Sequence, residues 1–410
     1  MKPMGPIPPY FEVRAGQLVL AGQPFSHWLA QVETTPAFIY DMGVVRQKVA
    51  AFRAAMPSEV SLHYAVKANP LPALIRAMVT EVDAFDVASG GELERVLAAG
   101  AAAEQISFAG PGKRDAALEA AIRAGVTINL ESESEAARAL SIAARLGVRP
   151  RLAVRVNPDF DIKGSGMRMG GGAKPFGVDA ERVPDLVRQL VDAGADWRGF
   201  HIFAGSQALD TEALIATQQA TVKLAADLAT QAGVAPPSVN LGGGFGIPYF
   251  PGDTPVDVER IGAALNATLA PRPEILRDTH FHIELGRWLV GECGVYLTRI
   301  LDRKISHQEV FLVVDGGLQH QLAASGNFGT VVRRNYPLAI ASAMDAPGDE
   351  EVSVVGCLCT PLDRLGDKVG LPHAEPGDVV AIFLAGAYGA SASPMDFLGH
   401  GPAEEMLVGV

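Results

Sequence analysis

The stretch from residue 62 to residue 102 opens with LHYAVKA (62–68) and AFDVAS (84–89), two short apolar runs typical of buried strands. The segment ELERVLAAGAA (92–102) then repeats its apolar residues every three to four positions, as a helix does. Six further strand-like runs follow at similar spacing: ISFAG (106–110), TINLES (127–132), RLAVRVN (151–157), GFHIFAGS (199–206), SVNLGGG (238–244) and FHIELG (281–286). Eight strand–helix units predict an α/β fold with a closed, TIM-like (β/α)8 barrel, and favour it over an open, doubly wound sheet.

The segments on either side of these units lack convincing helices. Residues 10–41 hold hairpin-like runs, and the chain after 290 contains VFLVVDGG, EVSVVGCLC and DVVAIFLAGAY separated by turn signals. We therefore predict a barrel over residues 42–285. Residues 286–402 are predicted to form a C-terminal all-β domain, a sandwich or barrel, that also takes in 10–41.

The composition is that of an ordinary folded protein. The chain has 410 residues, of which 48% are hydrophobic and 20% charged. A net charge of −12 argues against general nucleic-acid binding, and no apolar run of about eighteen residues indicates a membrane helix. The N-terminus lacks the apolar core of a signal peptide, and three cysteines are too few for a disulfide framework. We expect a cytoplasmic protein without nucleic-acid or membrane partners.

Polar residues at the carboxyl ends of the predicted barrel strands are the candidates for chemistry, because active sites of such barrels lie there. Lys67, in HYAVKANP, is the most informative of them. A partly buried lysine has a lowered pKa and becomes a nucleophile for carbonyl groups. The alternative is a structural lysine that reaches solvent from a strand end.

The glycine run in VNLGGGFG follows a predicted strand and suits close approach of the backbone to an anion. It does not open a helix, since Pro248 and Tyr249 follow, so it does not match a dinucleotide-binding turn. GPGK (110–113) lacks the spacing of a P-loop. The pattern therefore indicates a small phosphorylated cofactor rather than a nucleotide.

His280, His282 and Glu284 alternate along one predicted strand and so lie on one face. Two interpretations remain open: a His-x-His metal pair with a carboxylate, or a barrel strand in which only Glu284 reaches the site. A metal pair needs further ligands on other strands, and no second histidine cluster is present. We favour the second interpretation and expect no metal.

Nine motifs carry a family resemblance, and they occur in one order: HYAVKANP, FDVASGGELE, NLESESE, LAVRVNP, GFHIFAGSQ, NLGGGFGIPY, IELGR, CLCTPLDRL and AGAYGAS. The chain resembles the pyridoxal-phosphate-dependent decarboxylases of the alanine-racemase fold type, the ornithine, lysine, arginine and diaminopimelate decarboxylase group. It is most similar to the branch of butirosin-type and exosortase-associated decarboxylases, which shares CTPLDRLG. The resemblance spans about residues 35–395 and implies pyridoxal 5'-phosphate as cofactor.

The resemblance also implies roles for individual residues. Lys67 would attach the cofactor, Glu284 would face its pyridine nitrogen, and Cys359 would reach the cofactor of a neighbouring subunit and return a proton to the substrate carbon. The implied phosphate-binding residues are Ser206, Gly243, Gly244, Arg287 and Tyr388. The residues implied near the ring, the lysine or the substrate are Asp86, Glu92, Arg155 and Asp363. Structural alternatives are a buried apolar thiol for Cys359, which Cys357 is expected to be, and a packed aromatic ring for Tyr388.

Three departures from the family pattern concern the substrate. Phe203 stands where related enzymes stack a histidine on the cofactor, with His201 two residues earlier. Thr360 stands where related enzymes have an acidic residue that binds the distal amine of the substrate. The distal arginine element of diaminopimelate enzymes is missing, although Arg333 and Arg334 are near its place. Because a buried charge needs its partner, these losses argue against diamines and diaminopimelate as substrates.

The sequence thus predicts a decarboxylase that acts on an amino acid, or on an amino-acyl group bound to a carrier protein, and releases CO₂ and an amine. It predicts a homodimer with shared active sites, because one subunit's Cys359 completes the other's site. A racemase of the same fold and a non-catalytic cofactor-binding regulator are the alternatives.

Overall fold

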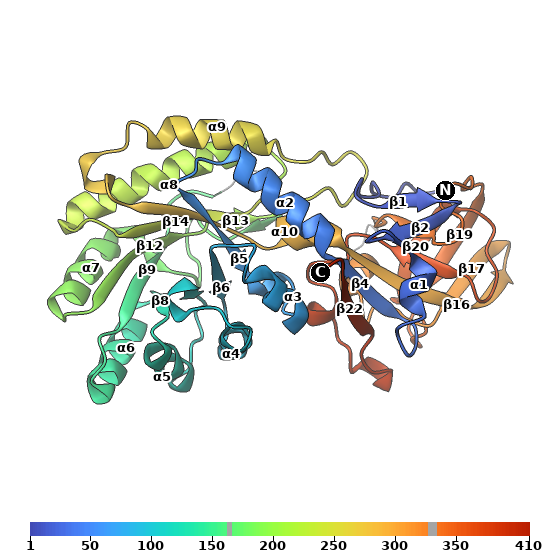
Figure 1. Ribbon diagram of the computed structural model, residues 1–410, viewed down its shortest axis with the longest axis horizontal. Helices are drawn as coiled ribbons and strands as arrows, with labels where there is room; N and C mark the ends of the chain where they lie inside the picture. The colour runs from blue at the N-terminus through green and yellow to red at the C-terminus, as the bar shows by residue number, and fades with distance from the viewer. Residues whose placement is uncertain (162–165, 327–333) are drawn as a thin grey trace. The chain divides into compact units, whose positions relative to one another are not determined.

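The computed structural model describes residues 1–161, 166–326 and 334–410. Its contacts divide the chain into two compact units (Figure 1). The barrel unit comprises residues 48–246 and 255–286, and the β unit comprises 1–47, 247–254 and 287–410. The short segment 247–254, which lies inside the predicted barrel range, groups with the β unit.

Eight parallel strands close into a barrel, which confirms the predicted fold class. In spatial order each strand pairs with the next, and β8 pairs with β9 to close the ring. The strands are β9 (Arg151–Asn157), β12 (Asp196–Ile202), β14 (Ser238–Gly243), β15 (His280–Leu285), β5 (Val60–Ala65), β6 (Ala84–Val87), β7 (Ile106–Phe108) and β8 (Thr127–Leu130). β11 (Val178–Asp179) adds to β9, and β10 (Met167–Arg168) pairs with β13 (Gly205–Ser206).

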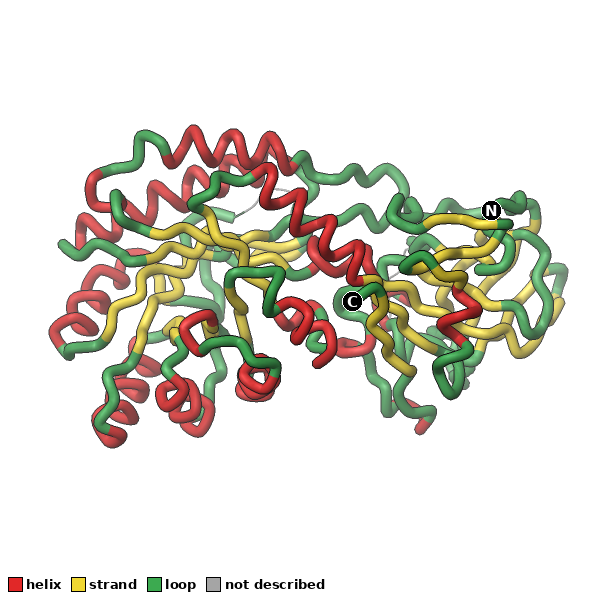
Figure 2. Tube along the Cα trace, viewed as in Figure 1, coloured by secondary structure: helices red, strands yellow, loops and turns green. Residues whose placement is uncertain are grey.

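Helices surround these strands (Figure 2). They are α2 (Met42–Ala55), α3 (Pro72–Met78), α4 (Gly90–Ala98), α5 (Asp115–Ala124), α6 (Glu133–Leu146), α7 (Val183–Asp192), α8 (Thr211–Ala232) and α9 (Val258–Leu269). The N-termini of α4 and α6 are capped by Ser89 and Ser132, whose hydroxyls accept hydrogen bonds from the backbone N–H groups of Glu92 and Glu135. Left-handed Gly147 ends α6.

The strand that carries Lys67 ends earlier than predicted. β5 stops at Ala65, and Lys67 lies in a single 3₁₀ turn, Val66–Ala68. The Asn69 N–H donates to the Val66 carbonyl, and the Tyr64 hydroxyl donates to the Asn69 carbonyl at 2.8 Å. These bonds turn the backbone away from the sheet, so Lys67 belongs to the loop at the carboxyl end of β5.

The β unit is built on an eight-stranded mixed sheet to which both ends of the chain contribute. β4 (Ala37–Asp41), from the N-terminal segment, pairs antiparallel with β16 (Gly294–Ser306) and parallel with β22 (Glu404–Val408). The other strands are β17 (Glu309–Val314), β18 (Leu338–Ile340), β19 (Glu350–Val355), β20 (Arg364–Leu371) and β21 (Val379–Ile382). A three-stranded sheet of β1 (Glu12–Arg14), β2 (Gln17–Leu20) and β3 (Gln23–Pro24), with helices α1 (Phe25–Leu29) and α10 (Arg287–Val290), completes the unit.

Among the helices of the described ranges, none is both long enough and apolar enough to cross a membrane.

Candidate active site

Glu284 is a buried carboxylate near the carboxyl end of β15, where strand alternation turns its side chain into the barrel. His201, on β12, donates from Nε2 to Glu284 Oε2 at 3.1 Å, and Asn240, on β14, donates to the same oxygen at 3.0 Å. Both neighbours are themselves buried. Three adjacent strands therefore fix one oxygen of this carboxylate, while Oε1 accepts no hydrogen bond from the described residues.

The surroundings of Glu284 keep it charged. Burial by itself would raise the pKa of the Glu284 carboxyl. The His201 hydrogen bond and the positive charges of His201, Lys67 and Arg155 outweigh that effect, so the pKa lies well below its usual range. The site thus holds a fixed negative charge that faces the barrel axis.

Lys67 and Phe203 lie next to each other in the barrel unit. The Lys67 ammonium is 5.4 Å from the centroid of the Phe203 ring. Phe203 follows β12 directly and is buried, whereas the Lys67 side chain is exposed. The expectation of a partly buried lysine is therefore wrong, because the 3₁₀ turn after β5 carries the side chain beyond the packed interior.

Asp86, in β6, is buried, and neither of its carboxylate oxygens has a hydrogen-bond partner among the described residues. The imidazole of His63, in β5, lies beside it, with Nδ1 3.3 Å from Asp86 Oδ2. Sequence analysis missed both His63 and Asn240. The alternation of side chains along a strand could have revealed both residues. His63 lies on the same face of β5 as Ala65, and Asn240 lies on the same face of β14 as Gly242 of the glycine motif.

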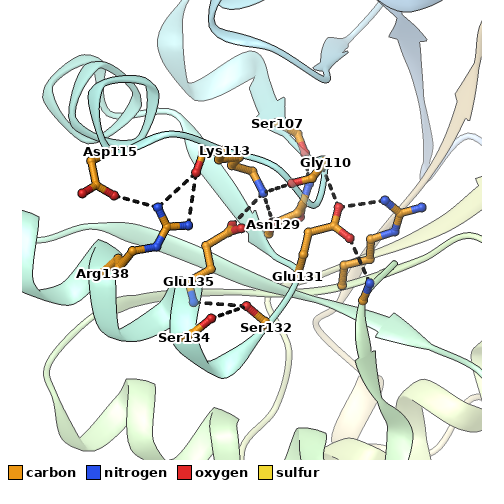
Figure 3. A network of polar contacts seen from close by, with 12 residues as sticks. Ser107, Gly110, Lys113, Asp115, Asn129, Glu131, Ser132, Ser134, Glu135 and Arg138 are labelled. Atoms are coloured by element: carbon orange, nitrogen blue, oxygen red, sulfur yellow. Dashed lines mark hydrogen bonds and ion pairs between the residues drawn. The ribbon is translucent and has the colours of Figure 1, made fainter. Parts of the chain in front are cut away.

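Arg155 belongs to a buried network of charges, and Figure 3 shows the part of this network around Lys113, Glu131 and Glu135. Its guanidinium donates to Glu131 Oε1 at 2.8 Å, and Glu131 also accepts hydrogen bonds from the backbone N–H groups of Gly110 and Gly177. Beside it, Lys113 pairs with Glu135 at 2.7 Å. Lys113, from GPGK, is thus a structural residue, and the Arg155 charge is shared with Glu131 as well as with Glu284.

The glycine run at the end of β14 allows close packing of the backbone. Gly242 has a φ of +69°, which suits glycine, and a Cβ atom on Gly243 would lie 1.9 Å from the Glu284 carbonyl oxygen. The Gly244 carbonyl accepts a hydrogen bond from Ala208 N–H, and Ser206 lies in β13. Side chains at these glycines would separate β14 from β15 and displace Glu284.

Within the β unit, Arg287 and Tyr388 form a cluster with Tyr249. Arg287 donates to the Tyr249 hydroxyl at 2.7 Å, and its guanidinium carbon lies 4.6 Å from the centroid of the Tyr388 ring. Arg287 Nε is buried and has no hydrogen-bond partner among the described residues. Tyr249, which sequence analysis did not select as a site residue, orients the arginine.

The loop after β19 holds Cys357, Cys359, Thr360 and Asp363. Cys359 is exposed, so the structural alternative of a buried thiol does not describe it. Cys357 is half-buried, where Gln319 donates to its sulfur and His400 Nδ1 lies 3.7 Å away; burial raises the pKa of this thiol. It is therefore not the purely apolar thiol that we expected.

Asp363 is buried and accepts hydrogen bonds from the backbone N–H groups of Leu318 and Leu358 at 2.7 and 2.9 Å. Burial raises the pKa of the Asp363 carboxyl, and this effect outweighs the two hydrogen bonds, which lower the pKa. Both oxygens are thus engaged in shaping the loop, which gives Asp363 a structural role alongside the substrate contact predicted for it.

Arg334, the candidate reader of a distal carboxylate, has partners within the β unit. One of its guanidinium nitrogens lies 3.6 Å from Asp253 Oδ1, and its guanidinium carbon lies 3.9 Å from the Phe250 ring centroid. Arg333 lies outside the described residues. The charge of Arg334 is therefore already balanced by a carboxylate of its own chain.

Comparisons with known proteins identify the family to which this chain is similar. The family model described as "pyridoxal-dependent decarboxylase, pyridoxal binding domain" matches residues 42–291. The L-glutamyl-[BtrI acyl-carrier protein] decarboxylase of Niallia circulans is 36% identical over 385 residues, 91% of this chain and 88% of that protein. The diaminopimelate decarboxylase of Methanothermobacter thermautotrophicus is 30% identical over 410 residues, with 97% and 92% covered. The crystal structure of diaminopimelate decarboxylase from Helicobacter pylori with L-lysine matches with a TM-score of 0.82 at 26% identity, covering 93% of this chain and 94% of that one.

Proposed function

Because the chain belongs to the family of pyridoxal-dependent decarboxylases, we propose that it decarboxylates an amino-acyl group whose far end is neutral or joined to a carrier protein. The enzyme is a pyridoxal-phosphate-dependent carboxy-lyase that acts on an amino acid or a carrier-bound amino-acyl substrate. The proposal of a neutral or carrier-linked far end rests on the contacts of the Arg334 guanidinium, which is paired with Asp253 and stacked on Phe250.

The residues present fit pyridoxal phosphate. Glu284 is ionised and has one oxygen without a hydrogen bond among the described residues, as a partner for a protonated pyridine nitrogen requires. In the β unit, the orphaned Arg287 Nε can donate to a phosphate. We propose that Lys67 holds the cofactor through its ε-amine and that the phosphate is bound by Ser206, Gly243, Gly244, Arg287 and Tyr388.

The bound cofactor supplies an electron sink for the electrons left behind when CO₂ departs. Glu284 keeps a proton on the pyridine nitrogen, because its own carboxyl stays ionised. His201 and Asn240 hold Glu284 in place, and Phe203 offers an aromatic face to the ring. We propose that Cys359 donates the proton that replaces CO₂ on Cα.

The preference for a capped or conjugated substrate follows from charge balance. A substrate with a free distal amine needs a carboxylate beside it, and Thr360 stands at the position where related enzymes carry one. A substrate with a free distal carboxylate needs an unpaired cation, and Arg334 would have to leave Asp253 to serve it. Arg334 is exposed, so breaking its pair with Asp253 costs no more than about 1 kcal/mol. A distal amine buried beside Thr360 without a carboxylate costs roughly 3–5 kcal/mol, so an uncharged or carrier-linked end is favoured.

We also propose that the enzyme is a cytoplasmic homodimer. Cys359 is exposed on its own chain, which suits a residue that contributes to a second subunit's site. The three cysteines are free thiols, as a reducing compartment maintains them.

The test is a substrate panel for the enzyme loaded with pyridoxal phosphate. We expect an L-glutamyl thioester of a carrier protein or of pantetheine to give CO₂ and the corresponding amine, quantified by mass spectrometry. The kcat/KM for diaminopimelate and ornithine should be at least about 100-fold lower, as a loss of about 3 kcal/mol implies. Thr360→Asp should raise the kcat/KM for ornithine relative to that for the thioester, and Thr360→Ser serves as its matched control. A diaminopimelate kcat/KM equal to that of the thioester would refute the proposed preference.

A further inference from the structure

The register of the barrel strands places Arg155 beside the residues that fix Glu284. Parallel pairing sets Arg155, on β9, opposite His201, on β12, and sets His201 opposite Asn240, on β14. Residues paired in this way on neighbouring parallel strands point to the same face of the sheet. His201 and Asn240 both reach Glu284 inside the barrel. The Arg155 side chain therefore points inward as well, in the same layer as this carboxylate.

Two buried groups in this layer carry opposite charges and have unused hydrogen-bonding capacity. Oε1 of Glu284 accepts no hydrogen bond from the described residues. A guanidinium has five N–H donors, and among the described residues Arg155 donates only through Nη1, to Glu131. Arginine keeps its charge at any pH at which the protein is folded, and the charge of Arg155 already acts on Glu284. Arg155 is thus a competitor for Oε1 unless another group restrains it.

Glu131 supplies that restraint. It directly follows β8 (Thr127–Leu130) and is buried. Its Oε1 accepts hydrogen bonds from Arg155 Nη1 at 2.8 Å and from the Gly110 N–H at 2.6 Å (Figure 3), and its Oε2 accepts one from the Gly177 N–H at 2.9 Å. Burial raises the pKa of Glu131, but the charge and hydrogen bond of Arg155, together with its other partners, outweigh this effect. A charged carboxylate with both oxygens engaged therefore holds the guanidinium.

The loops that donate to this carboxylate make the restraint stiff. Gly177 has a φ of +75°, and a Cβ atom there would lie 2.9 Å from the Arg155 carbonyl oxygen, so the loop before β11 packs directly against β9. The Phe176 ring centroid lies 5.0 Å from the guanidinium carbon. The Gly110 carbonyl in turn accepts a hydrogen bond from Lys113 at 2.8 Å. Neighbouring loops thus fix both the carboxylate and the arginine that it holds.

We propose that Glu131 is a positioning residue that holds Arg155 away from Glu284, so that Oε1 of Glu284 stays open to the pyridine nitrogen of the cofactor. This inference rests on the proposed contact between Glu284 and that nitrogen. Without the negative charge of Glu131, Arg155 loses its partner, and Glu284 is an ionised acceptor in the same layer. Arg155 then donates to Oε1 and competes with the cofactor for it.

The test compares how the cofactor-free protein binds pyridoxal phosphate and its 1-deaza analogue, in which a C–H group replaces the pyridine nitrogen. Both ligands carry the aldehyde and the phosphate, so the ratio of their Kd values isolates the contact to the ring nitrogen. We expect wild type to bind pyridoxal phosphate at least about tenfold more tightly than the analogue, as a hydrogen bond to a charged group implies. In Glu131→Gln the two Kd values should agree within about twofold, because Arg155 occupies Oε1. In Glu131→Gln combined with Arg155→Met the wild-type ratio should return, because the competing cation is gone.

The matched control is Glu135→Gln, which removes a buried carboxylate of the same network that pairs with Lys113 instead of Arg155. Its Kd ratio should equal that of wild type. Thermal unfolding identifies variants that fail to fold. If Glu131→Gln is one of them, Glu131→Asp, which keeps the charge but shortens its reach to Arg155, should lower the ratio at least about threefold. An unchanged ratio in the folded Glu131 variant, or an equal fall in Glu135→Gln, would overturn the inference.

A structure without cofactor separates this inference from the proposed function. A wild-type Kd ratio near one would refute the proposed contact between Glu284 and the pyridine nitrogen, whatever Glu131 does. The crystal structure of the cofactor-free Glu131 variant should show Arg155 donating to Glu284 Oε1. An Arg155 side chain that keeps its wild-type position there would rule out the role proposed for Glu131, whatever the cofactor contacts prove to be.

Discussion

At the scale of single residues, the charge of Glu284 is the feature most open to measurement. Replacement by Gln keeps the shape and a hydrogen-bonding partner for His201 but removes the negative charge that we propose holds a proton on the cofactor. We expect Glu284→Gln to lower kcat by about 10²–10³-fold, in the range found when one preorganised electrostatic group is removed. Asp227→Asn, which removes an exposed carboxylate paired with Lys223 on α8, is the matched control and should leave kcat unchanged.

The pH dependence of that variant follows from the lowered pKa of Glu284. The folded protein keeps this carboxyl ionised below the ordinary value near 4.3, so the stabilisation from Glu284 is complete above that pH and is lost as the pH falls further. The kcat ratio of wild type to Glu284→Gln should therefore be constant between pH 5.5 and about 8. A ratio that approaches one at pH 5.5 would mean that the wild-type carboxyl is already protonated there.

At the scale of elements, the network of Lys113, Glu135, Glu131 and Arg155 joins the loop before α5 to β8, α6 and β9. Lys113→Met leaves the buried Glu135 without its partner, and we expect it to lower the free energy of unfolding by about 3–5 kcal/mol. Lys113→Met combined with Glu135→Leu should recover much of this loss. Arg123→Met, in the exposed pair with Glu119, should cost less than about 1 kcal/mol. Urea unfolding of the wild type and the three variants measures these differences in the free energy of unfolding. Equal losses of this free energy in Lys113→Met and Arg123→Met would contradict the expectation.

The same scale shows how far the sequence predicts the structure. Each barrel strand overlaps its predicted run, because apolar periodicity reports which residues are buried whatever their partners are. The end of β5 is predicted too late, since it depends on a hydrogen bond from the Tyr64 side chain. Asp363 receives its structural role from the Leu318 N–H, 45 positions away, and Arg334 is engaged by Asp253. Pairings of this kind leave no local signal in the chain.

At the scale of the whole molecule, the proposed dimer predicts complementation between inactive variants. Lys67→Ala removes the lysine of a subunit's own site, and Cys359→Ala removes the thiol that we propose it lends to its partner. In a dimer that shares its sites, half of the subunit pairs in an equal mixture are hybrids, and each hybrid has one intact site. After subunit exchange we expect about one quarter of the wild-type activity, whereas either variant alone stays inactive. Activity that never rises above the two parents would show that each chain uses its own cysteine.

The sheet of the β unit also has a consequence for biosynthesis. The Tyr40 hydroxyl donates to a carboxylate oxygen of Glu405, a residue 365 positions further along the chain, and every residue of β4 is buried. On the ribosome, the apolar AFIYD strand emerges early and has no β22 beside it until nearly the whole remaining chain has been translated. The nascent protein therefore carries an open, aggregation-prone edge for most of its synthesis, and its yield in the cell should depend on chaperones that shield it.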